Sequence, residues 1–451
     1  MISKKYSSIF ASTKEVCKRM NEILKKMHRT KIIILGIIIT VISGKICAQN
    51  STNSPYTRFG YGILADKAFI SQRSMGGIGY GLRNSQMINP MNPASFSAID
   101  SLTFMFDLGF TAHISWFQDA WNKERKINGN LEYIAFQFPI TKKLGIGVGF
   151  EPVSFVGYNY KDTVHLPVDD RIVDNIYSGQ GGQSRVYGAL SYDFFNRVSV
   201  GAKISYLFGD ISRSNYVTFN SYDIYNTSWS DTLRSYGFLY DFGLQFHQPV
   251  GKFKTITVGA VYSPKIRFGA QVMTGERQID PSSGIVMNSK NSASRDSIFE
   301  FPESYGFGFT YNQLGKLIVG ADVLYQKWAE AKYYNQTNIL SNRLKLNAGG
   351  EFIPNRTGNS ILQKLHYRAG LSYSNSYLKV KNYGYNEYGI NLGLGIPFQD
   401  RRSLTRYSFL NLGVEYLLVR PESKALIDEQ YFKISLGFTF NELWFFKQRV
   451  Q

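Results

Sequence analysis

Residues 235–247 read Ser-Tyr-Gly-Phe-Leu-Tyr-Asp-Phe-Gly-Leu-Gln-Phe-His, and every second residue from Tyr236 to Phe246 is aromatic or leucine. Successive side chains of a β-strand point to opposite faces, so this segment has one apolar face and one face of small or polar residues. The same alternation recurs at 104–116, 388–398 and 432–440. The pattern predicts β-strands and an all-β fold.

About fourteen such segments follow one another through the rest of the chain. They lie near 102–116, 131–140, 144–158, 184–195, 198–209, 234–248, 255–272, 300–312, 316–328, 342–353, 365–378, 386–398, 407–420 and 431–443. Some are joined by short turns, as at 141–143 and 196–197, and others by long polar connections at 214–232, 273–299 and 379–386. Outer-membrane barrels combine short turns at one end with long loops at the other. We therefore expect a transmembrane antiparallel β-barrel of about 14 strands over 102–445, with a soluble β-sandwich as the alternative.

Composition excludes several other classes of protein. Aromatic residues make up 15% of the 451 residues and charged residues 19%, which fits neither a disordered chain nor a coiled coil. The formal net charge is +18, but residues 1–48 contain ten Lys or Arg and two Glu, so the remainder carries +10. The charge therefore gives no case for a nucleic-acid partner.

The N-terminal region has the pattern of a secretory signal peptide. A basic stretch at 28–31 precedes an apolar run at 32–42, and small residues follow up to Ala48. We expect cleavage after Ala48, so that 1–48 is removed, with an uncleaved anchor as the alternative. We interpret residues 1–26 as an extended or mis-called start, because Met20 and Met27 are also candidate starts. The exported chain is then expected in the bacterial outer membrane.

Cysteine chemistry is not expected in the mature protein. Cys17 and Cys47 are the only cysteines, and both precede the expected cleavage site. Cys47 follows Ile46 rather than the small residue that a lipoprotein signal requires. Neither a disulfide framework nor a thiol metal site is therefore available after cleavage.

Residues 49–101 form a region of different composition, rich in Gly, Ser, Asn and Pro but also in aromatic and apolar residues. Glycine and proline exclude long regular elements, whereas the apolar residues are unlike those of a flexible linker. We interpret the region as an ordered, irregular segment that packs against something larger.

Three short motifs make the chain resemble the FadL family of outer-membrane transporters of hydrophobic compounds, in a version typical of Bacteroidota. They are Met-Gly-Gly-Ile-Gly at 75–79, Asn-Pro-Ala-Ser at 92–95, and the ending Leu-Gly-Phe-Thr-Phe-Asn at 436–441 followed by Trp444 and Phe445. The resemblance implies a fourteen-stranded, porin-like barrel whose lumen is plugged by an N-terminal hatch, here 49–101. The family's barrels usually end on an aromatic residue, whereas this chain ends with the short basic tail 446–451.

The resemblance also implies a path for a hydrophobic ligand past the hatch. Its apolar residues are candidates to contact such a ligand, although they could equally serve only to pack the plug. The candidate hatch and ligand-path residues are Phe59, Tyr61, Met75, Ile78, Tyr80, Met87, Ile88, Met91, Asn92 and Pro93.

Charged residues recur on the polar face of the predicted strands. The candidate lumen charges are Asp107, Asp193, Lys203, Asp241, Asp322, Glu351, Arg368 and Glu415. An isolated charge in a partly dry lumen is costly, so we expect these groups to pair with one another or with Arg73 and Arg83 of the hatch. Glycines on the same face, such as Gly243 and Gly393, leave room for the hatch backbone.

No catalytic or metal-binding motif is present. The mature chain has four histidines without metal-ligand spacing, and it contains neither HExxH nor GxSxG. We expect no enzyme activity, no cofactor and no metal.

Three hypotheses for function follow. The first is passive uptake of hydrophobic, fatty-acid-like small molecules past the hatch. The second is a structural or assembly subunit of a multiprotein outer-membrane complex, and an outer-membrane hydrolase is a distant third. Expected partners are outer-membrane lipid and lipopolysaccharide, a hydrophobic ligand, and other outer-membrane proteins in the second case.

Overall fold

The computed structural model describes residues 51–165, 172–399 and 407–443. The expected signal peptide, its cleavage site after Ala48 and the basic tail 446–451 lie outside these residues. No helix among the described residues has both the length and the apolar character needed to cross a membrane.

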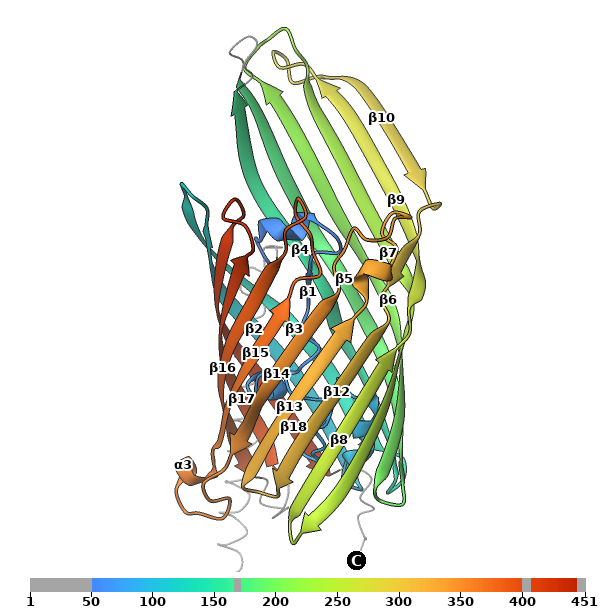
Figure 1. Cartoon of the computed structure of the whole chain (residues 1–451), viewed down its shortest axis with the longest axis vertical. Helices are drawn as coiled ribbons and strands as arrows, with labels where there is room; N and C mark the ends of the chain where they lie inside the picture. Colours follow the sequence, from blue (N-terminus) through green and yellow to red (C-terminus); the bar gives the residue numbers. More distant parts are fainter. Residues whose placement is uncertain (1–50, 166–171, 400–406, 444–451) are drawn as a thin grey trace, which may run out of the picture. The chain divides into compact units, whose positions relative to one another are not determined.

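Fourteen long strands form the wall of a closed antiparallel barrel (Figure 1). The first seven are β2 (Thr103–Gln118), β3 (Lys123–Pro139), β4 (Leu144–His165), β5 (Ile172–Phe194), β6 (Val198–Phe219), β7 (Asn226–Gly251) and β8 (Lys254–Ser263). The others are β12 (Ser304–Gln313), β13 (Leu317–Gln326), β14 (Arg343–Phe352), β15 (His366–Asn375), β16 (Tyr385–Gln399), β17 (Tyr407–Pro421) and β18 (Asp428–Leu443). Pairing of β8 with β12 and of β18 with β2 closes the wall, which confirms the predicted fold.

The apolar face of the strands points out of the barrel. On β7, Phe238, Phe242 and Phe246 are about half exposed, whereas Asp241 and Gln245 are buried on the inward side. This is the arrangement of a barrel whose outer surface meets lipid and whose lumen is polar.

The remaining elements are shorter. Those N-terminal to the wall are η1 (Pro55–Arg58), β1 (Ile63–Leu64), α2 (Ile70–Arg73) and η2 (Pro93–Ala98). Those between wall strands are β9 (Ile266–Ile279), β10 (Val286–Ser294), β11 (Phe299–Phe301), η3 (Trp328–Glu330) and α3 (Ile361–Lys364). We call the end of the barrel with short connections the turn end, and the opposite end the loop end.

Part of the sheet continues beyond the barrel at the loop end. The wing consists of β9, β10 and the segments 157–165 of β4, 172–180 of β5, 211–219 of β6 and 226–235 of β7, at the top of Figure 1. The expectation that 214–232 and 273–299 are loops is therefore wrong. The predicted strand 255–272 is also divided, because Pro264 has no N–H to donate and separates β8 from β9.

Candidate functional site

The lumen is occupied by residues 51–101, which we call the luminal segment. Inward-facing glycines of the wall let its backbone approach closely. A Cβ on Gly370 would collide with the backbone of Met75 and Gly76, and one on Gly243 would collide with Asn92. The wall and the luminal segment are thus in van der Waals contact on several strands.

Three ion pairs of 3.0 Å or less join the luminal segment to the wall. Arg73 Nη2 lies 2.8 Å from Glu132 Oε2, Arg83 Nη2 lies 3.0 Å from Asp193 Oδ2, and Lys345 Nζ lies 2.7 Å from Asp66 Oδ2. The position of Asp66 away from bulk solvent would by itself raise its pKa. The charges of Lys345 and Arg73 outweigh that effect and hold the pKa of Asp66 below its usual range.

Wall side chains also bind the backbone of the luminal segment directly. The carboxylate of Asp322 accepts hydrogen bonds from the N–H groups of Gly79 and Tyr80, with N to O distances of 2.5 and 2.8 Å. The amide of Asn347 donates to the carbonyl of Gly77, and that of Gln245 donates to the carbonyls of Tyr80 and Leu82. These bonds fix the conformation of the glycine-rich stretch 76–82.

A cluster of five charges lies deeper in the lumen. Lys203 Nζ is 3.3 Å from Asp241 and 3.5 Å from Glu151, and Arg185 pairs with both acids. Lys67 of the luminal segment approaches Asp241 at 3.6 Å. Three cations therefore surround two carboxylates, and Lys67 is the most exposed member, at 32%.

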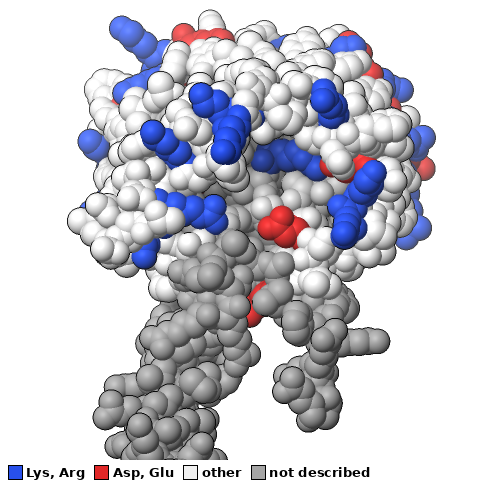
Figure 2. Space-filling model, turned by 90° about the horizontal axis from the view of Figure 1, so that it is seen from below, with Lys and Arg blue, Asp and Glu red and all other residues white. Residues whose placement is uncertain are grey.

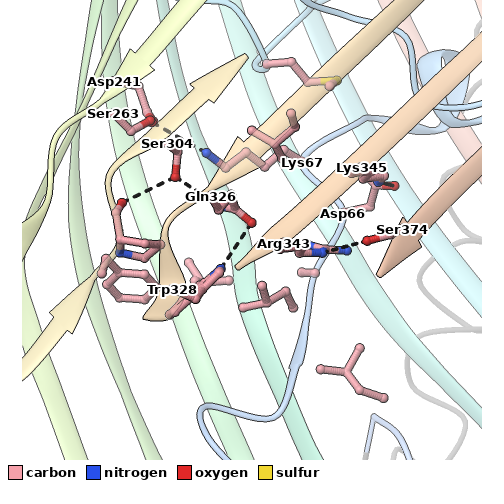
Figure 3. Close-up of a pocket in the computed structure, with 18 of the residues that line it drawn as sticks. Asp66, Lys67, Asp241, Ser263, Ser304, Gln326, Trp328, Arg343, Lys345 and Ser374 are labelled. Atoms are coloured by element: carbon pink, nitrogen blue, oxygen red, sulfur yellow. Dashed lines mark hydrogen bonds and ion pairs between the residues drawn. The ribbon is translucent and has the colours of Figure 1, made fainter. Parts of the chain in front are cut away.

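Two adjoining cavities flank β1. The larger, of about 190 Å³, has Lys67, Arg343 and Lys345 in its lining (Figure 3). Its apolar lining residues include Tyr80, Met91, Leu239, Ile266, Phe301, Leu324 and Trp328. The smaller, of about 110 Å³, is lined by residues of β2, β3 and β16 to β18 and by Phe155 of β4, and it shares residues 63–66 with the larger.

The barrel wall has a slit between β3 and β4. These strands pair only from Ile134 with Phe150 to Pro139 with Gly145, and beyond Phe150 β4 pairs with β5 but not with β3. The edge left open is occupied by the luminal segment. Ile63 and Leu64 of β1 pair with Phe155 and Ser154 of β4. Further along, the Thr57 hydroxyl bonds both the N–H and the carbonyl of Gly157.

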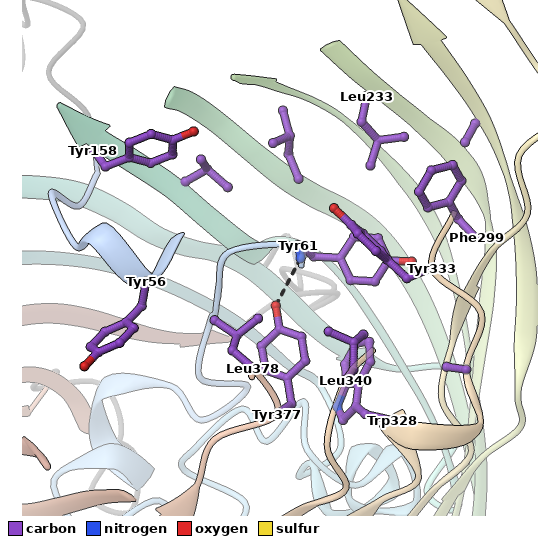
Figure 4. Close-up of a cluster of buried hydrophobic side chains, with 14 of the residues drawn as sticks. Tyr56, Tyr61, Tyr158, Leu233, Phe299, Trp328, Tyr333, Leu340, Tyr377 and Leu378 are labelled. Carbon is purple, nitrogen blue, oxygen red and sulfur yellow. Dashed lines mark hydrogen bonds between the residues drawn. The ribbon is translucent and has the colours of Figure 1, made fainter. Parts of the chain in front are cut away.

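An aromatic cluster closes the lumen above β1 at the loop end (Figure 4). Tyr61 is fully buried there and contacts Trp328 and Tyr333 from the loop at 327–342. Tyr377 donates a hydrogen bond to the carbonyl of Gly62 and accepts one from the N–H of Tyr61. Two loops are thereby attached to the luminal segment.

The predicted hatch residues fall into separate groups. Only Tyr80 and Met91 of the ten line the larger cavity. Phe59 and Tyr61 belong to the aromatic cluster, Met75, Ile78 and Met87 pack together against Ile318, and Ile88 packs in a third group. Asn92 caps η2, which begins at Pro93, by accepting from Ala94 N–H.

The predicted lumen charges all face inward, and most have a charged neighbour. Besides the pairs above, Glu351 binds Arg368 at 2.7 Å, and Glu415 binds Lys433 at 3.1 Å. Asp107 accepts hydrogen bonds from Tyr133 and Thr439. Neither Asp107 nor Asp322 forms an ion pair among the described residues.

Sequence reasoning missed Asp66, Lys67, Glu132, Glu151 and Arg185. Glu151 and Arg185 stand at inward positions of segments that were predicted as strands, so counting alternate residues would have found them. Asp66 and Lys67 have no such signal, because the irregular chain around them has no period. Within the part of the chain that the structure describes, no three His, Cys, Asp or Glu side chains are grouped to hold a metal ion.

Comparison with known proteins identifies one family and several structures of the same fold. A model of the family named BamG matches residues 27–451. A search of curated protein sequences found no match.

The similar solved structures include two toluene transporters and a FadL homologue. The Pseudomonas putida toluene transporter TodX superposes with a TM-score of 0.59 at 14% identity, covering 86% of this chain and 99% of its own. A FadL homologue of Pseudomonas aeruginosa gives 0.55 at 13%, covering 84% and 99%. The Ralstonia pickettii toluene transporter TbuX gives 0.53 at 12%, covering 83% and 98%. At these identities the likeness establishes the FadL-like fold.

Proposed function

The chain belongs to the BamG family, and we propose that it is an outer-membrane barrel that passively takes up hydrophobic, fatty-acid-like small molecules past its luminal segment. In this proposal the short connections of the turn end face the periplasm and the loop end faces the cell exterior. The protein performs no chemical reaction.

The observation that carries the proposal is the slit between β3 and β4, which the two-residue strand β1 occupies with a cavity on either side. A net hydrogen bond contributes about 1 kcal/mol, so detaching so short a strand costs little compared with opening the continuous wall. Withdrawal of β1 would join the two cavities to each other and to the slit.

The chemistry of the larger cavity fits an amphipathic guest. Apolar side chains such as Leu239 and Leu324 would contact a hydrocarbon portion. Lys67 would face a polar or anionic group, because the cluster to which it belongs has three cations and only two carboxylates. A cavity of about 190 Å³ holds only part of a long hydrocarbon chain, so passage of such a molecule requires the luminal segment to move.

A cysteine cross-link tests this route. Leu64 and Ser154 are directly opposed in the pairing of β1 with β4, within the reach of a disulfide. In the Leu64→Cys/Ser154→Cys variant, oxidation should abolish uptake of a labelled long-chain fatty acid into proteoliposomes, and reduction should restore it. The matched control is Phe307→Cys/Val323→Cys, an opposed pair within the continuous wall. Equal uptake by the oxidised and reduced β1–β4 variant would contradict the proposal.

A second candidate is a structural or assembly subunit of an outer-membrane complex, and the wing favours it. All nine residues of β10 are exposed, and among the described strands β10 forms its ladder with β9 alone. An unpaired strand edge is a template for pairing with another chain. Under this candidate the luminal segment is a permanent seal.

Native purification separates the two candidates. A stoichiometric hydrophobic small molecule detected by mass spectrometry favours uptake. A co-purifying protein that is lost when residues 276–290 are replaced by a short turn, but kept when loop 422–427 is shortened, favours the subunit. Heat-dependent migration in gels would verify that both shortened barrels fold.

A further inference from the structure

The two ends of the barrel differ sharply in charge. The described turn-end connections between wall strands, at 140–143, 195–197, 252–254, 314–316 and 353–365, contain no Asp or Glu, and the link from the luminal segment to β2 adds one acid, Asp100. They contain eight basic residues, namely Lys142, Lys143, Arg197, Lys252, Lys254, Lys316, Arg356 and Lys364. Figure 2, which views this end, shows Lys and Arg distributed around the rim.

The loop end has no such excess. Its described connections at 119–122, 220–225, 280–285, 327–342, 376–384 and 422–427 contain five acidic and five basic residues. The basic charge of the barrel ends is therefore concentrated on one side, and the loop-end connections offer little net attraction for the phosphates of lipopolysaccharide.

Each described turn-end connection also exposes an apolar side chain beside its basic residues. Phe195, at 84% exposed, precedes Arg197 by two positions, and Phe253, at 64%, lies between Lys252 and Lys254. Ile140, Leu314, Ile361 and Leu362 are also more than half exposed. A positive φ at Phe195 and Phe253, unusual for residues other than glycine, places an aromatic residue where a turn would normally favour glycine or asparagine.

The outward face of the wall shows where these side chains lie relative to a bilayer. On β7 the outward aromatic residues run from Tyr236 to Phe246, and on β16 from Tyr388 to Phe398. Ten residues at about 3.3 Å each, tilted by about 40°, span about 25 Å, the height of the apolar band of such barrels. The turn-end connections begin just beyond this band, at the depth of lipid headgroups.

From these observations we infer that the turn end binds anionic phospholipid headgroups of the adjacent leaflet. The exposed apolar side chains of the connections lie at the boundary of the acyl chains, and the Lys and Arg side chains contact the phosphates. No ion pair with a described residue is formed by seven of these side chains, so their charge is available to phosphate; they are Lys142, Lys143, Arg197, Lys252, Lys254, Lys316 and Lys364. Their distribution over every described turn-end connection fits lipids, which surround a barrel, better than a protein bound to one side. This inference does not depend on what the barrel transports.

Lipid retention by the full-length protein tests the inference. The protein would be extracted, exchanged into mixed micelles with equal amounts of phosphatidylglycerol and phosphatidylcholine, and analysed by native mass spectrometry. We expect phosphatidylglycerol to be retained selectively and the selectivity to decline with salt, because exposed charges are screened. Equal retention of both lipids, or selectivity insensitive to salt, would overturn the inference.

Charge-neutralised variants locate the site. Changing Lys142, Lys143, Lys252, Lys254 and Lys316 to Gln should reduce the phosphatidylglycerol preference strongly, since each cation near an anionic surface contributes about fivefold to binding. The control changes loop-end Lys332, Lys379, Lys381 and Lys424 to Gln and should leave the preference intact. Equal losses in both variants, or capture of an acidic protein in place of lipid by the wild type, would refute lipid binding at the turn end. Salt dependence of the wild type keeps the test decisive should the first variant fail to fold.

Discussion

Arg73 of the luminal segment and Glu132 of β3 form an ion pair whose side chains are each 9% exposed, with 2.8 Å between Nη2 and Oε2. Glu132 stands two residues beyond Ile134, where the pairing of β3 with β4 ends. The pair therefore attaches the luminal segment to the wall at the border of the slit. The strength of this ion pair affects both the stability of the luminal segment and how easily the slit opens.

Removing one partner of this pair should weaken the attachment of the luminal segment to the wall. In Arg73→Met, Glu132 is left as an unpaired charge in the lumen, which costs about 3 to 5 kcal/mol for a buried pair. We expect a lower unfolding midpoint in urea and larger single-channel conductance in planar bilayers.

The double variant Arg73→Met/Glu132→Met is the control for this effect. Replacing both partners with apolar groups removes the uncompensated charge, so most of the lost stability should return. A double variant as unstable as the single one would show that the pair itself is not the cause.

Asp322 should be required for the conformation of the glycine-rich stretch. The N–H groups of Gly79 and Tyr80 both donate to the same carboxylate oxygen, Oδ2, so Asp322→Ala removes the acceptor and leaves both buried donors unpaired. We expect a loss of about 1 to 3 kcal/mol in the free energy of unfolding. Asp210→Asn, which removes an exposed pair with Arg234, should change it little. Equal effects would argue against a special role for Asp322.

Much of the fold follows from period-two alternation, and the exceptions have physical reasons. A wall strand faces lipid on one side and the lumen on the other, so its sequence alternates. The outer part of the wing has partly or fully exposed side chains on both faces, so Ser, Thr and Asn occur on both, as at 226–230, and the alternation disappears. These strands are held by backbone hydrogen bonds to neighbouring strands, and the sequence does not show which strands are neighbours.

The site was less predictable than the wall. Inward charges such as Asp241 follow from strand parity, but their partners depend on which strands are neighbours in the closed barrel. The position of β1 beside β4 is set by two residues, too few for any periodic signal. Glycine was informative where it faces the lumen, since Gly243 and Gly393 contact Asn92 and Ser74 of the luminal segment.

Two glycines of the wall offer a matched test of this close packing. A methyl group on Gly370 would meet the backbone of Met75 and Gly76, whereas one on outward-facing Gly188 would meet no atom within 4 Å. Gly370→Ala should therefore cost about 1 to 3 kcal/mol of stability through overpacking. Gly188→Ala should stay within about 0.5 kcal/mol of wild type. The thermal unfolding midpoints of both variants can be measured from the loss of the gel band of the compact, folded barrel. Indistinguishable midpoints would contradict tight packing at Gly76.

The pair between Asp66 and Lys345 should make stability depend on acid pH. The folded-state pKa of Asp66 is below its ordinary value of about 3.9, so the pair stabilises the protein at pH above that value. The contribution is lost as pH falls toward the folded-state pKa, where protonation removes the charge. The difference in unfolding midpoint between wild type and Asp66→Asn should thus be constant from about pH 6 to 8 and shrink below about pH 4. Asp210→Asn serves as the exposed control, and a difference for Asp66→Asn that widens in acid would reverse the assigned sign.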